Sequence, residues 1–329
     1  MISANNPDQI FRDVPNDGPV IVAVSGGSDS IALLHLASVW SCLKNVELKV
    51  VTVDHGLRPE AAAEAGFVAG VSESLNIPHF TLAWDGVKPS SGVSEAARNA
   101  RYMLIEEFAS DIGACAILVG HTINDQAETI WMRNSRHGGN PQWRGLSGMA
   151  KQTVLPSGLR LFRPLFHSSR AELREYLRAI GQSWIEDPSN LDRSYERVRA
   201  RQSLQSSEIG IDAICRLGAL LGRQRKLISD KTFKLLQEHL VVSDGPVFEA
   251  PDGMFENPDK NSAILMVQLL IAIAGGREHL VTYETAQSVI DLPVGSRMSA
   301  GYAIAERKKH AFRFFREKRF LPTMHVNPF

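Results

Sequence analysis

Short apolar runs alternate with helix-like segments between residue 20 and residue 133 of the chain. The runs are rich in β-branched residues, as buried strands are, and cover Val20–Val24, Leu48–Val53, His79–Ala83 and Ala116–Val119. The segments between them have helical spacing and cover Ile31 to Val39, about Pro59 to Leu75, Ser94–Ala109 and about Asn124 to Arg133. Ser94 is the expected N-cap of its helix. This alternation predicts an α/β doubly wound fold, a parallel sheet with helices on both faces.

The pattern changes after about Ser206, where it becomes mainly helical. Helical runs cover Ile211–Leu221 and Asp230–Leu240, and the most apolar run, Ala263–Ala274, reads as a buried helix because it is too short to span a bilayer. A chain of 329 residues is long for one core. We therefore predict a domain over residues 1–205 and a smaller, mainly helical C-terminal domain over residues 206–329.

Composition limits the class of protein. Three scattered cysteines argue against a disulfide framework, a zinc ribbon or an iron–sulfur site and fit a reducing compartment. The N-terminus lacks the basic and apolar segments of a signal peptide, so we expect a cytoplasmic protein without a membrane anchor. Formal net charge is zero, but residues 133–202 carry 13 Lys and Arg against 6 Asp and Glu. That excess indicates either a polyanion contact or a solvated surface with ion pairs.

The segment V-S-G-G-S-D-S directly after the first strand carries the strongest chemical signal. Gly26 and Gly27 can adopt positive φ, and a helix that starts at Ser28-Asp29-Ser30 would aim its free N–H groups at an anion. A Walker loop needs a lysine that is absent here. The spacing predicts a phosphate cradle of another kind; the alternative is a plain strand-turn-helix corner.

Two more strings follow predicted strands. Asp54, His55 and Gly56 end the second strand, where they form either part of a nucleotide site or a simple turn with Asp54 capping. After the fourth strand, Gly120 and His121 precede Asp125 and Glu128, at helical spacing from His121. His121, Asp125 and Glu128 could hold Mg²⁺ or orient phosphate. Alternatively, Asn124 or Asp125 only caps the helix and Glu128 is its capping-box partner.

Two arginine-rich segments complete the candidates. Arg98 and Arg101 share a predicted helix and either contact phosphate or pair with Glu95 or Glu106. The segment Trp184–Arg201 follows a turn signature with several arginines, which could bind RNA by phosphate contact and stacking near Tyr195 and Trp184 or form a surface helix.

Ser25-Gly-Gly-Ser-Asp-Ser30 resembles the PP-loop of the N-type ATP pyrophosphatases. These enzymes cleave ATP between the α- and β-phosphates and adenylate an oxygen of their substrate. The resemblance implies that Ser25, Ser28, Ser30 and the loop backbone hold pyrophosphate, and that Asp29 binds Mg²⁺.

Further strings resemble the tRNA(Ile)-lysidine synthase family over roughly residues 18–202. They occur in the family's order: Val53-Asp-His-Gly-Leu-Arg58, Ala97-Arg-Asn-Ala-Arg-Tyr102, Gly120-His-Thr-Ile-Asn-Asp-Gln-Ala-Glu-Thr129, Gly145-Leu-Ser-Gly-Met149, Arg163-Pro-Leu165 and Trp184-Ile-Glu-Asp-Pro-Ser-Asn190. The resemblance implies adenylation of the wobble cytidine of tRNA(Ile) with a CAU anticodon, followed by displacement of AMP by free L-lysine. We expect the protein to be a monomer or homodimer.

The same resemblance implies roles for individual residues. The catalytic set is Asp29, His121, Asp125 and Glu128, with Asp29 and Asp125 as metal ligands. The ATP-binding set is Ser25, Gly26, Gly27, Ser28, Asp29, Ser30, Asp54, His55, Arg98 and Gly120. Arg101, Arg197 and Arg201 would contact RNA or phosphate, and the C-terminal domain would contact tRNA.

The chain departs from the family pattern in three places. The segment Arg136–Arg144 is longer than its family counterpart, Val198 replaces an asparagine, and the C-terminal third matches only in general helical character. Three rival functions remain at this point. A tRNA 2-thiolase would need a cysteine pair or cluster ligands, a small-molecule adenylating enzyme would lack a basic RNA surface, and a binding module would catalyse nothing.

Overall fold

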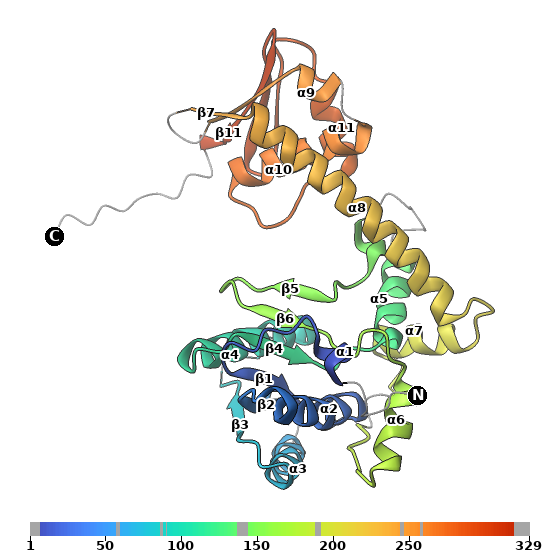
Figure 1. Cartoon of the computed structure of the whole chain (residues 1–329). Helices are drawn as coiled ribbons and strands as arrows, with labels where there is room; N and C mark the ends of the chain where they lie inside the picture. The colour runs from blue at the N-terminus through green and yellow to red at the C-terminus, as the bar shows by residue number, and fades with distance from the viewer. Residues whose placement is uncertain are drawn as a thin grey trace, which may run out of the picture. The chain divides into compact units, whose positions relative to one another are not determined.

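The computed structural model describes residues 7–56, 60–85, 88–89, 91–136, 144–187, 192–243, 247–256 and 259–318. The chain forms two compact units, Met1–Ala219 and Leu220–Phe329. Figure 1 labels the helices and strands of both units.

The first unit contains a six-stranded sheet in the order β3-β2-β1-β4-β6-β5. Its strands are β1 (Val20–Ala23), β2 (Leu48–Asp54), β3 (His79–Ala83), β4 (Ala116–Val119), β5 (Gln152–Val154) and β6 (Arg160–Phe162). All neighbours pair in parallel except β5, which runs antiparallel to β6 at the edge. The four predicted strands are confirmed; β5 and β6 were not predicted, because three residues are too few to show a period.

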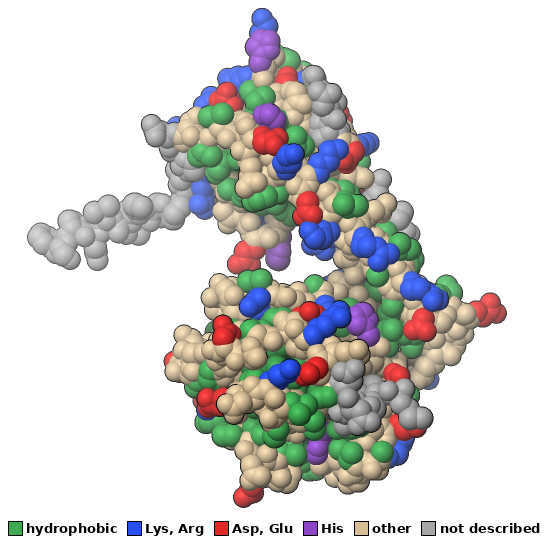
Figure 2. All heavy atoms as spheres, in the orientation of Figure 1, with side chains coloured by type: hydrophobic (Ala, Val, Ile, Leu, Met, Phe, Trp, Pro, Cys, Tyr) green, Lys and Arg blue, Asp and Glu red, His purple; other side chains and the backbone are tan. Residues whose placement is uncertain are grey.

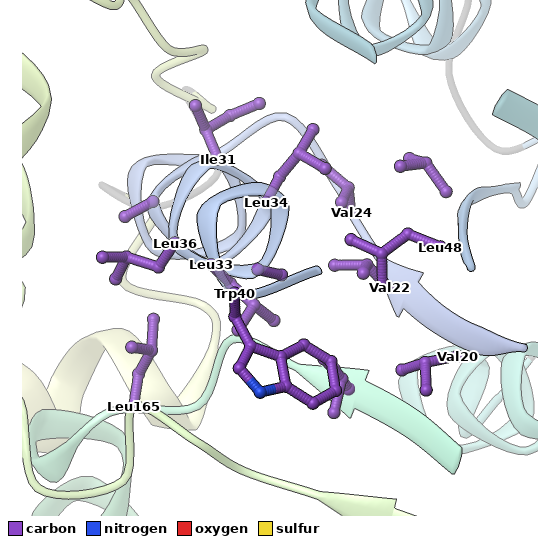
Figure 3. Packing of buried hydrophobic residues seen from close by; sticks show 14 of the residues in the cluster. Val20, Val22, Val24, Ile31, Leu33, Leu34, Leu36, Trp40, Leu48 and Leu165 are labelled. Carbon is purple, nitrogen blue, oxygen red and sulfur yellow. The ribbon is translucent and has the colours of Figure 1, made fainter. Parts of the chain in front are cut away.

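Helices cover both faces of this sheet, as predicted. They are α1 (Pro7–Phe11), α2 (Ser28–Lys44), α3 (Ala61–Ser74), α4 (Val93–Asp111), α5 (Ile123–Arg136), α6 (Arg170–Ala179) and α7 (Glu196–Gln205), with the 3₁₀ turn η1 (Arg144–Ser147). Val20, Val22 and Val24 pack against α2 (Figure 3), whereas Ile21 joins a second cluster with Ile105 of α4. Alternate side chains of β1 therefore point to opposite faces of the sheet and pack in the two hydrophobic clusters.

Two predicted helix boundaries were imprecise and one cap was wrong. Helix α2 begins at Ser28, three residues before the predicted Ile31, and runs on to Lys44. Helix α4 begins at Val93, and its N-cap is Gly92 at φ 67°, not the predicted Ser94. Glycine takes this left-handed conformation without a Cβ penalty, so it starts the helix one residue earlier. The predicted start of α3 at Pro59 lies outside the described residues.

The second unit combines helices with a five-stranded antiparallel sheet in the order β7-β8-β11-β10-β9. Its strands are β7 (Val241–Ser243), β8 (Val247–Pro251), β9 (Arg297–Ala300), β10 (Ala303–Arg307) and β11 (Ala311–Arg316). Its helices are the end of α8 (Ile211–His239), α9 (Gly253–Glu256), α10 (Lys260–Gly275) and α11 (Tyr283–Ile290). The helical character was predicted; the sheet was not.

Helix α10 contains the most apolar run of the chain and is buried on nearly every side. Its one interruption, Gln268, donates a hydrogen bond to the backbone oxygen of Val281 at 2.7 Å, which satisfies the buried amide. Among the described helices, none combines the length and apolar character needed to cross a membrane.

Candidate active site

The loop between β1 and α2 is shaped to receive an anion. Gly26 has φ 88°, and a Cβ there would come within 2.7 Å of Ile185, so only glycine fits. Ser30 Oγ accepts a hydrogen bond from the Ser25 backbone N–H at 3.2 Å and donates one to the Gly27 oxygen at 3.0 Å. The N-cap residue of α2 is Gly27, and no side-chain cap is formed there among the described residues. The first N–H groups of the helix therefore remain available to a bound phosphate.

A cavity of about 570 Å³ opens beside this loop, at the carboxyl ends of β1 and β4. Its loop side is lined by Ser25, Gly27, Ser28, Asp29 and Ser30, and its apolar side by Ala23, Val51, Val53, Ile105 and Val119. Gly120 also lines the cavity, and a Cβ there would lie 3.0 Å from the backbone of Asp29. Polar and apolar sides of this kind suit a nucleotide.

A cluster of three arginines and three carboxylates, here called the charge cluster, lies next to the loop. Arg170 of α6 connects the three acids: its Nε is 3.1 Å from Asp29 Oδ2, its Nη2 is 3.0 Å from Asp125 Oδ1, and its Nη1 is 3.4 Å from Glu128 Oε1. Arg197 of α7 contacts Asp125 Oδ1 and Glu128 Oε2, both at 2.7 Å. The cluster thus joins four helices around one group of charges.

Glu128 lies at the centre of the charge cluster. Its side chain is 2% exposed, and Arg201 Nε donates to its Oε1 at 2.8 Å, which gives it three arginine partners. A buried carboxylate is stable only when paired and hydrogen-bonded, and losing one partner of such a group is costly. The pairing thus links α6 and α7 to α5 through buried ion pairs.

Burial and neighbouring charges shift the pKa values of the cluster in different directions. Burial raises the pKa of Asp29 more than Arg170 lowers it. Burial also opposes ionisation of Asp125, but Arg197, Arg170 and the Thr122 N–H together hold the pKa of Asp125 below its usual value. The charged form is thus favoured at Asp125 and disfavoured by burial at Asp29, although Arg170 pairs with both carboxylates.

Asp125 also lies in the first turn of α5 and takes part in its cap, so the capping alternative is partly correct. Its Oδ2 accepts hydrogen bonds from Thr122 N at 2.7 Å and Thr122 Oγ1 at 2.8 Å. The capping partner is thus Thr122, and Glu128 plays no part in the cap. Asn124 Oδ1 instead accepts the backbone N–H of Arg170 at 2.9 Å, which fixes the start of α6.

His121 lies outside α5 and lines the cavity between the loop and the charge cluster. Burial lowers the pKa of His121 to about 4, so its ring is neutral at physiological pH. Its buried Nδ1 has no hydrogen-bond partner among the described residues. Such a buried polar atom without a partner is uncommon in folded proteins, which marks His121 as a residue of interest beside the cavity.

Of the predicted candidates on and after β2 and on α4, only one lines the cavity. Arg101 lines it and donates from Nη2 to His55 Nε2 at 3.1 Å, which requires the proton of neutral His55 to be on Nδ1. Asp54 Oδ1 accepts the Gly56 N–H, as the turn alternative stated, and Arg98 stacks over Tyr102 at 5.1 Å. Neither Asp54, His55 nor Arg98 lines the cavity.

Two functional candidates on α6 were missed from the sequence. Arg170 organises the charge cluster, and Arg174 lines the cavity and donates to Ser28 Oγ at 3.4 Å. The signal that could have found this helix is Ser169-x-x-Glu172, which forms a complete capping box. The expected stacking near Trp184 involves Arg174 and Arg178 of α6, each 5.8 Å from the ring. Residues 188–190 of the turn signature lie outside the described residues.

The donor set suits Mg²⁺ even though, among the described residues, no group of three or more His, Cys, Asp or Glu side chains is arranged to hold a metal. Mg²⁺ commonly takes one or two carboxylates and completes its shell with phosphates and waters. Asp29 and Asp125 are two such carboxylates, held near each other by one guanidinium beside the loop. None of the three cysteines, all of which are described, lines the cavity.

Comparison with known proteins places this site in a family. A model of the PP-loop domain matches residues 2–208. The tRNA(Ile)-lysidine synthase of Rhizobium meliloti is 38% identical over 324 residues, covering 94% of this chain and 70% of its own. That of Ruegeria pomeroyi is 36% identical over 308 residues, covering 93% of this chain and 73% of its own.

One solved structure, the U34-tRNA thiolase NcsA of Methanococcus maripaludis, is similar in fold. Its TM-score is 0.55 at 17% identity, over 66% of this chain and 79% of its own. This likeness supports the PP-loop fold alone. With the PP-loop geometry and the extent of the sequence match, the chain belongs to the tRNA(Ile)-lysidine synthase family of PP-loop proteins.

Proposed function

We propose that this protein uses ATP to convert the wobble cytidine of tRNA(Ile) with a CAU anticodon to lysidine. The C2 oxygen of the base attacks the α-phosphate of ATP and pyrophosphate leaves. The amine of free L-lysine then attacks C2, and AMP leaves with the oxygen. The observation that carries the proposal is one cavity bounded by both the PP-loop and the charge cluster, in a chain of this family.

The PP-loop would hold the pyrophosphate portion of ATP. Ser25, Ser28, Ser30 and the N–H groups at the start of α2 offer neutral donors, and the helix dipole favours an anion there. Gly26, Gly27 and Gly120 keep the backbone close enough for contact. The apolar side of the cavity at Val53 and Ile105 would receive the adenine.

Asp29 and Asp125 would hold Mg²⁺ together with the phosphates. A bound Mg²⁺ neutralises charge on the leaving pyrophosphate. Because Arg170 now bridges both carboxylates, cation binding would require that the guanidinium shift from at least one of them. The freed guanidinium could then contact phosphate oxygens, which it binds in the same bidentate geometry as carboxylates.

Arg101, Arg197 and Arg201 remain the proposed contacts to RNA or phosphate. All three line the cavity, and Arg197 is the most exposed arginine of the charge cluster, at 42%. His121, which lines the cavity with a neutral ring, would orient the nucleotide or the incoming amine. A wobble base is unpaired, so it can be extruded into such a cavity.

The remaining proposals concern the whole chain. Residues 1–205 would form the catalytic domain and residues 206–329 would contact tRNA. Basic side chains recur along α8 on the face drawn in Figure 2, which supports an RNA contact. We propose a cytoplasmic enzyme that acts as a monomer or homodimer.

The direct test is incorporation of labelled lysine. The protein is incubated with ATP, Mg²⁺, radiolabelled L-lysine and tRNA(Ile) bearing a CAU anticodon. We expect label in this tRNA and none in the methionine tRNA with the same anticodon. Absence of label from tRNA(Ile), together with tRNA-independent pyrophosphate release, would instead support a small-molecule adenylating enzyme.

A further inference from the structure

The segment Gly145–Met149 lies within the first unit, and none of the functions assigned above uses it. It overlaps the 3₁₀ turn η1 and leads toward β5. All five of its residues are described, and none of them lines the nucleotide cavity. The segment is nevertheless bound to α5, the helix that carries Asp125 and Glu128.

Gln126 of α5 pairs with this segment through its side-chain amide. Its Oε1 accepts the backbone N–H of Met149 at 2.7 Å, and its Nε2 donates to the backbone oxygens of Met149 and Ser147, both at 3.3 Å. Gln126 is only 5% exposed, so these bonds satisfy an amide that has lost contact with water. An amide that accepts from and donates to the same residue fixes orientation as well as distance.

Two further features fit the segment to the same face of α5. Arg133 lies seven residues after Gln126, two helical turns along, and its Nη1 donates to the oxygens of Gly145 and Gly148, both at 2.9 Å. Gly148 has φ 71°, and a Cβ on it would overlap the side-chain amide of Gln126. Only glycine therefore fits at this position, and the segment is held at two points along the helix.

The Gln126 bonds bear on the site because Gln126 follows Asp125 directly in α5. Side-chain atoms lie roughly 5–6 Å from a helix axis, so a rotation of about 10° about that axis moves them by about 1 Å. Such a rotation would displace the carboxylates of both Asp125 and Glu128. A displacement of about 1 Å can lower the rate of a positioned reaction by about 10²-fold.

The charge cluster also holds these carboxylates, but through groups that have to exchange partners. Arg170 and Arg197 contact Asp125, and under the proposed function Arg170 leaves at least one carboxylate when a cation binds. The bonds of Gln126 are formed with neutral backbone groups, and Gln126 does not line the nucleotide cavity. They can therefore persist while the arginines move.

We propose that Gln126 is a positioning residue for adenylation. Through its pairing with Met149 it keeps α5, and with it Asp125 and Glu128, in place while the charge cluster exchanges partners. The inference rests on the proposed function, because it concerns the adenylation step. The competing interpretation is that the pairing only stabilises the Gly145–Met149 segment, in which case its loss would lower the free energy of unfolding without changing the rate of a folded molecule.

The first test approaches from the helix. Gln126→Met keeps the length of the side chain and removes all three bonds. Ser72→Ala is the matched control, because the fully buried Ser72 Oγ donates to the Ile77 oxygen at 2.7 Å on α3 and does not line the cavity. Adenylation of tRNA(Ile) is followed in single turnovers with the full-length protein in excess, at several ATP concentrations, and unfolding in urea is measured in parallel.

A single-turnover rate constant does not depend on how many protein molecules are folded, so it separates position from stability. We expect Gln126→Met to lower the maximal rate constant by about 10- to 100-fold, with little change in the ATP concentration that gives half of it. Ser72→Ala should keep the wild-type rate constant, although both variants lose a buried hydrogen bond and some stability.

The second test approaches from the segment. Gly148→Ala adds one methyl group against the Gln126 amide. Gly158, in the turn between β5 and β6, has φ 86° and open space around the position of a Cβ, so Gly158→Ala introduces comparable backbone strain without the contact. We expect Gly148→Ala to lower the maximal rate constant as Gln126→Met does, and Gly158→Ala to match the wild type.

Wild-type rate constants in both Gln126→Met and Gly148→Ala, with reduced stability, would reduce the pairing to a structural anchor and overturn the inference. A weaker response to ATP with an unchanged maximal rate would also overturn it. Should Gln126→Met not fold, Gln126→Glu, which keeps the shape and the bond from the Met149 N–H, takes its place with the same expected loss. If the wild type itself adenylates no tRNA, the proposed function fails and the inference falls with it.

Discussion

The two sides of the candidate site satisfy their polar groups in opposite ways. At the PP-loop, the N–H groups at the start of α2 have no side-chain cap, and the serines bond mainly within the loop. At the charge cluster, every carboxylate already has at least one arginine partner. The PP-loop can therefore bind an added anion, whereas the carboxylates of the charge cluster are already neutralised by arginines of the protein.

This difference indicates how the site responds to substrate. A loop with free donors can bind phosphate without rearranging. The charge cluster can bind Mg²⁺ or phosphate only by exchanging partners, because its charges are paired and mostly buried. Part of the arginine excess of residues 133–202 therefore forms mostly buried ion pairs within the protein. The sequence had suggested either a contact to a polyanion or ion pairs on a solvated surface, and these arginines match neither description fully.

The largest expected effect comes from Asp29, which belongs to both sides. Asp29→Asn keeps the shape of the loop but removes the charge proposed to hold the cation, so adenylation should fall by about 10³-fold. tRNA binding should be nearly unchanged. Asp13→Asn, at an exposed ion pair with Lys151, is the matched control. Near-normal AMP formation by Asp29→Asn would refute the metal role.

Removing Arg170 tests whether the charge cluster is internally neutralised. Arg170→Ala leaves three carboxylates with fewer cations, and we expect the free energy of unfolding to fall by about 3 kcal/mol in urea titrations. Arg160→Ala, at an exposed position on β6, should cost far less. An equal cost at both positions would mean that Arg170 is not structurally required.

The pH dependence of stability reports on His121. Its pKa of about 4 lies below the value of about 6.5 in an unfolded chain, so the unfolded state binds more protons between these pH values. Stability should therefore fall as the pH drops through this range, by about 2 kcal/mol at pH 5 from this group. His121→Asn should flatten the profile, and His279→Asn, at an exposed position, should not. Coincident profiles for wild type and His121→Asn would contradict a buried neutral ring.

The smallest expected effect is a difference in tRNA binding between variants of Arg197 and Arg199, which lie on the same helix. Arg197 lines the cavity, whereas Arg199 donates to the backbone oxygens of Arg193 and Ser194. Arg197→Ala should weaken tRNA binding a few-fold and reduce the slope of log K against log salt by about 1. Arg199→Ala should leave the slope unchanged. Equal slopes for both variants and the wild type would confine Arg197 to the charge cluster.

The PP-loop could be predicted because all of its groups come from six consecutive residues after a strongly apolar strand. The charge cluster could not, although Asp125, Glu128, Arg197 and Arg201 were individually selected. Their pairing depends on α6 and α7 packing beside α5, and Arg170 takes part only through that packing. No local pattern marks such a contact between distant segments.

The sheet of the second unit was missed for a related reason. In β9 the apolar Met298 and Ala300 alternate with Arg297 and Ser299, but the strand is only four residues long. Its one neighbour, β10, has only five residues, and the pairing between strands supplies most of the order. The long apolar run of α10 dominated the pattern, so this region was predicted as mainly helical.

The most direct test of the account is a two-step reaction with α-labelled ATP. Protein, Mg²⁺ and tRNA(Ile) are first mixed without lysine, and lysine is then added. We predict that labelled, adenylated tRNA accumulates in the first step and is converted to lysidine-containing tRNA with release of labelled AMP in the second. Release of AMP without any adenylated tRNA, or an adenylate that lysine does not discharge, would contradict it.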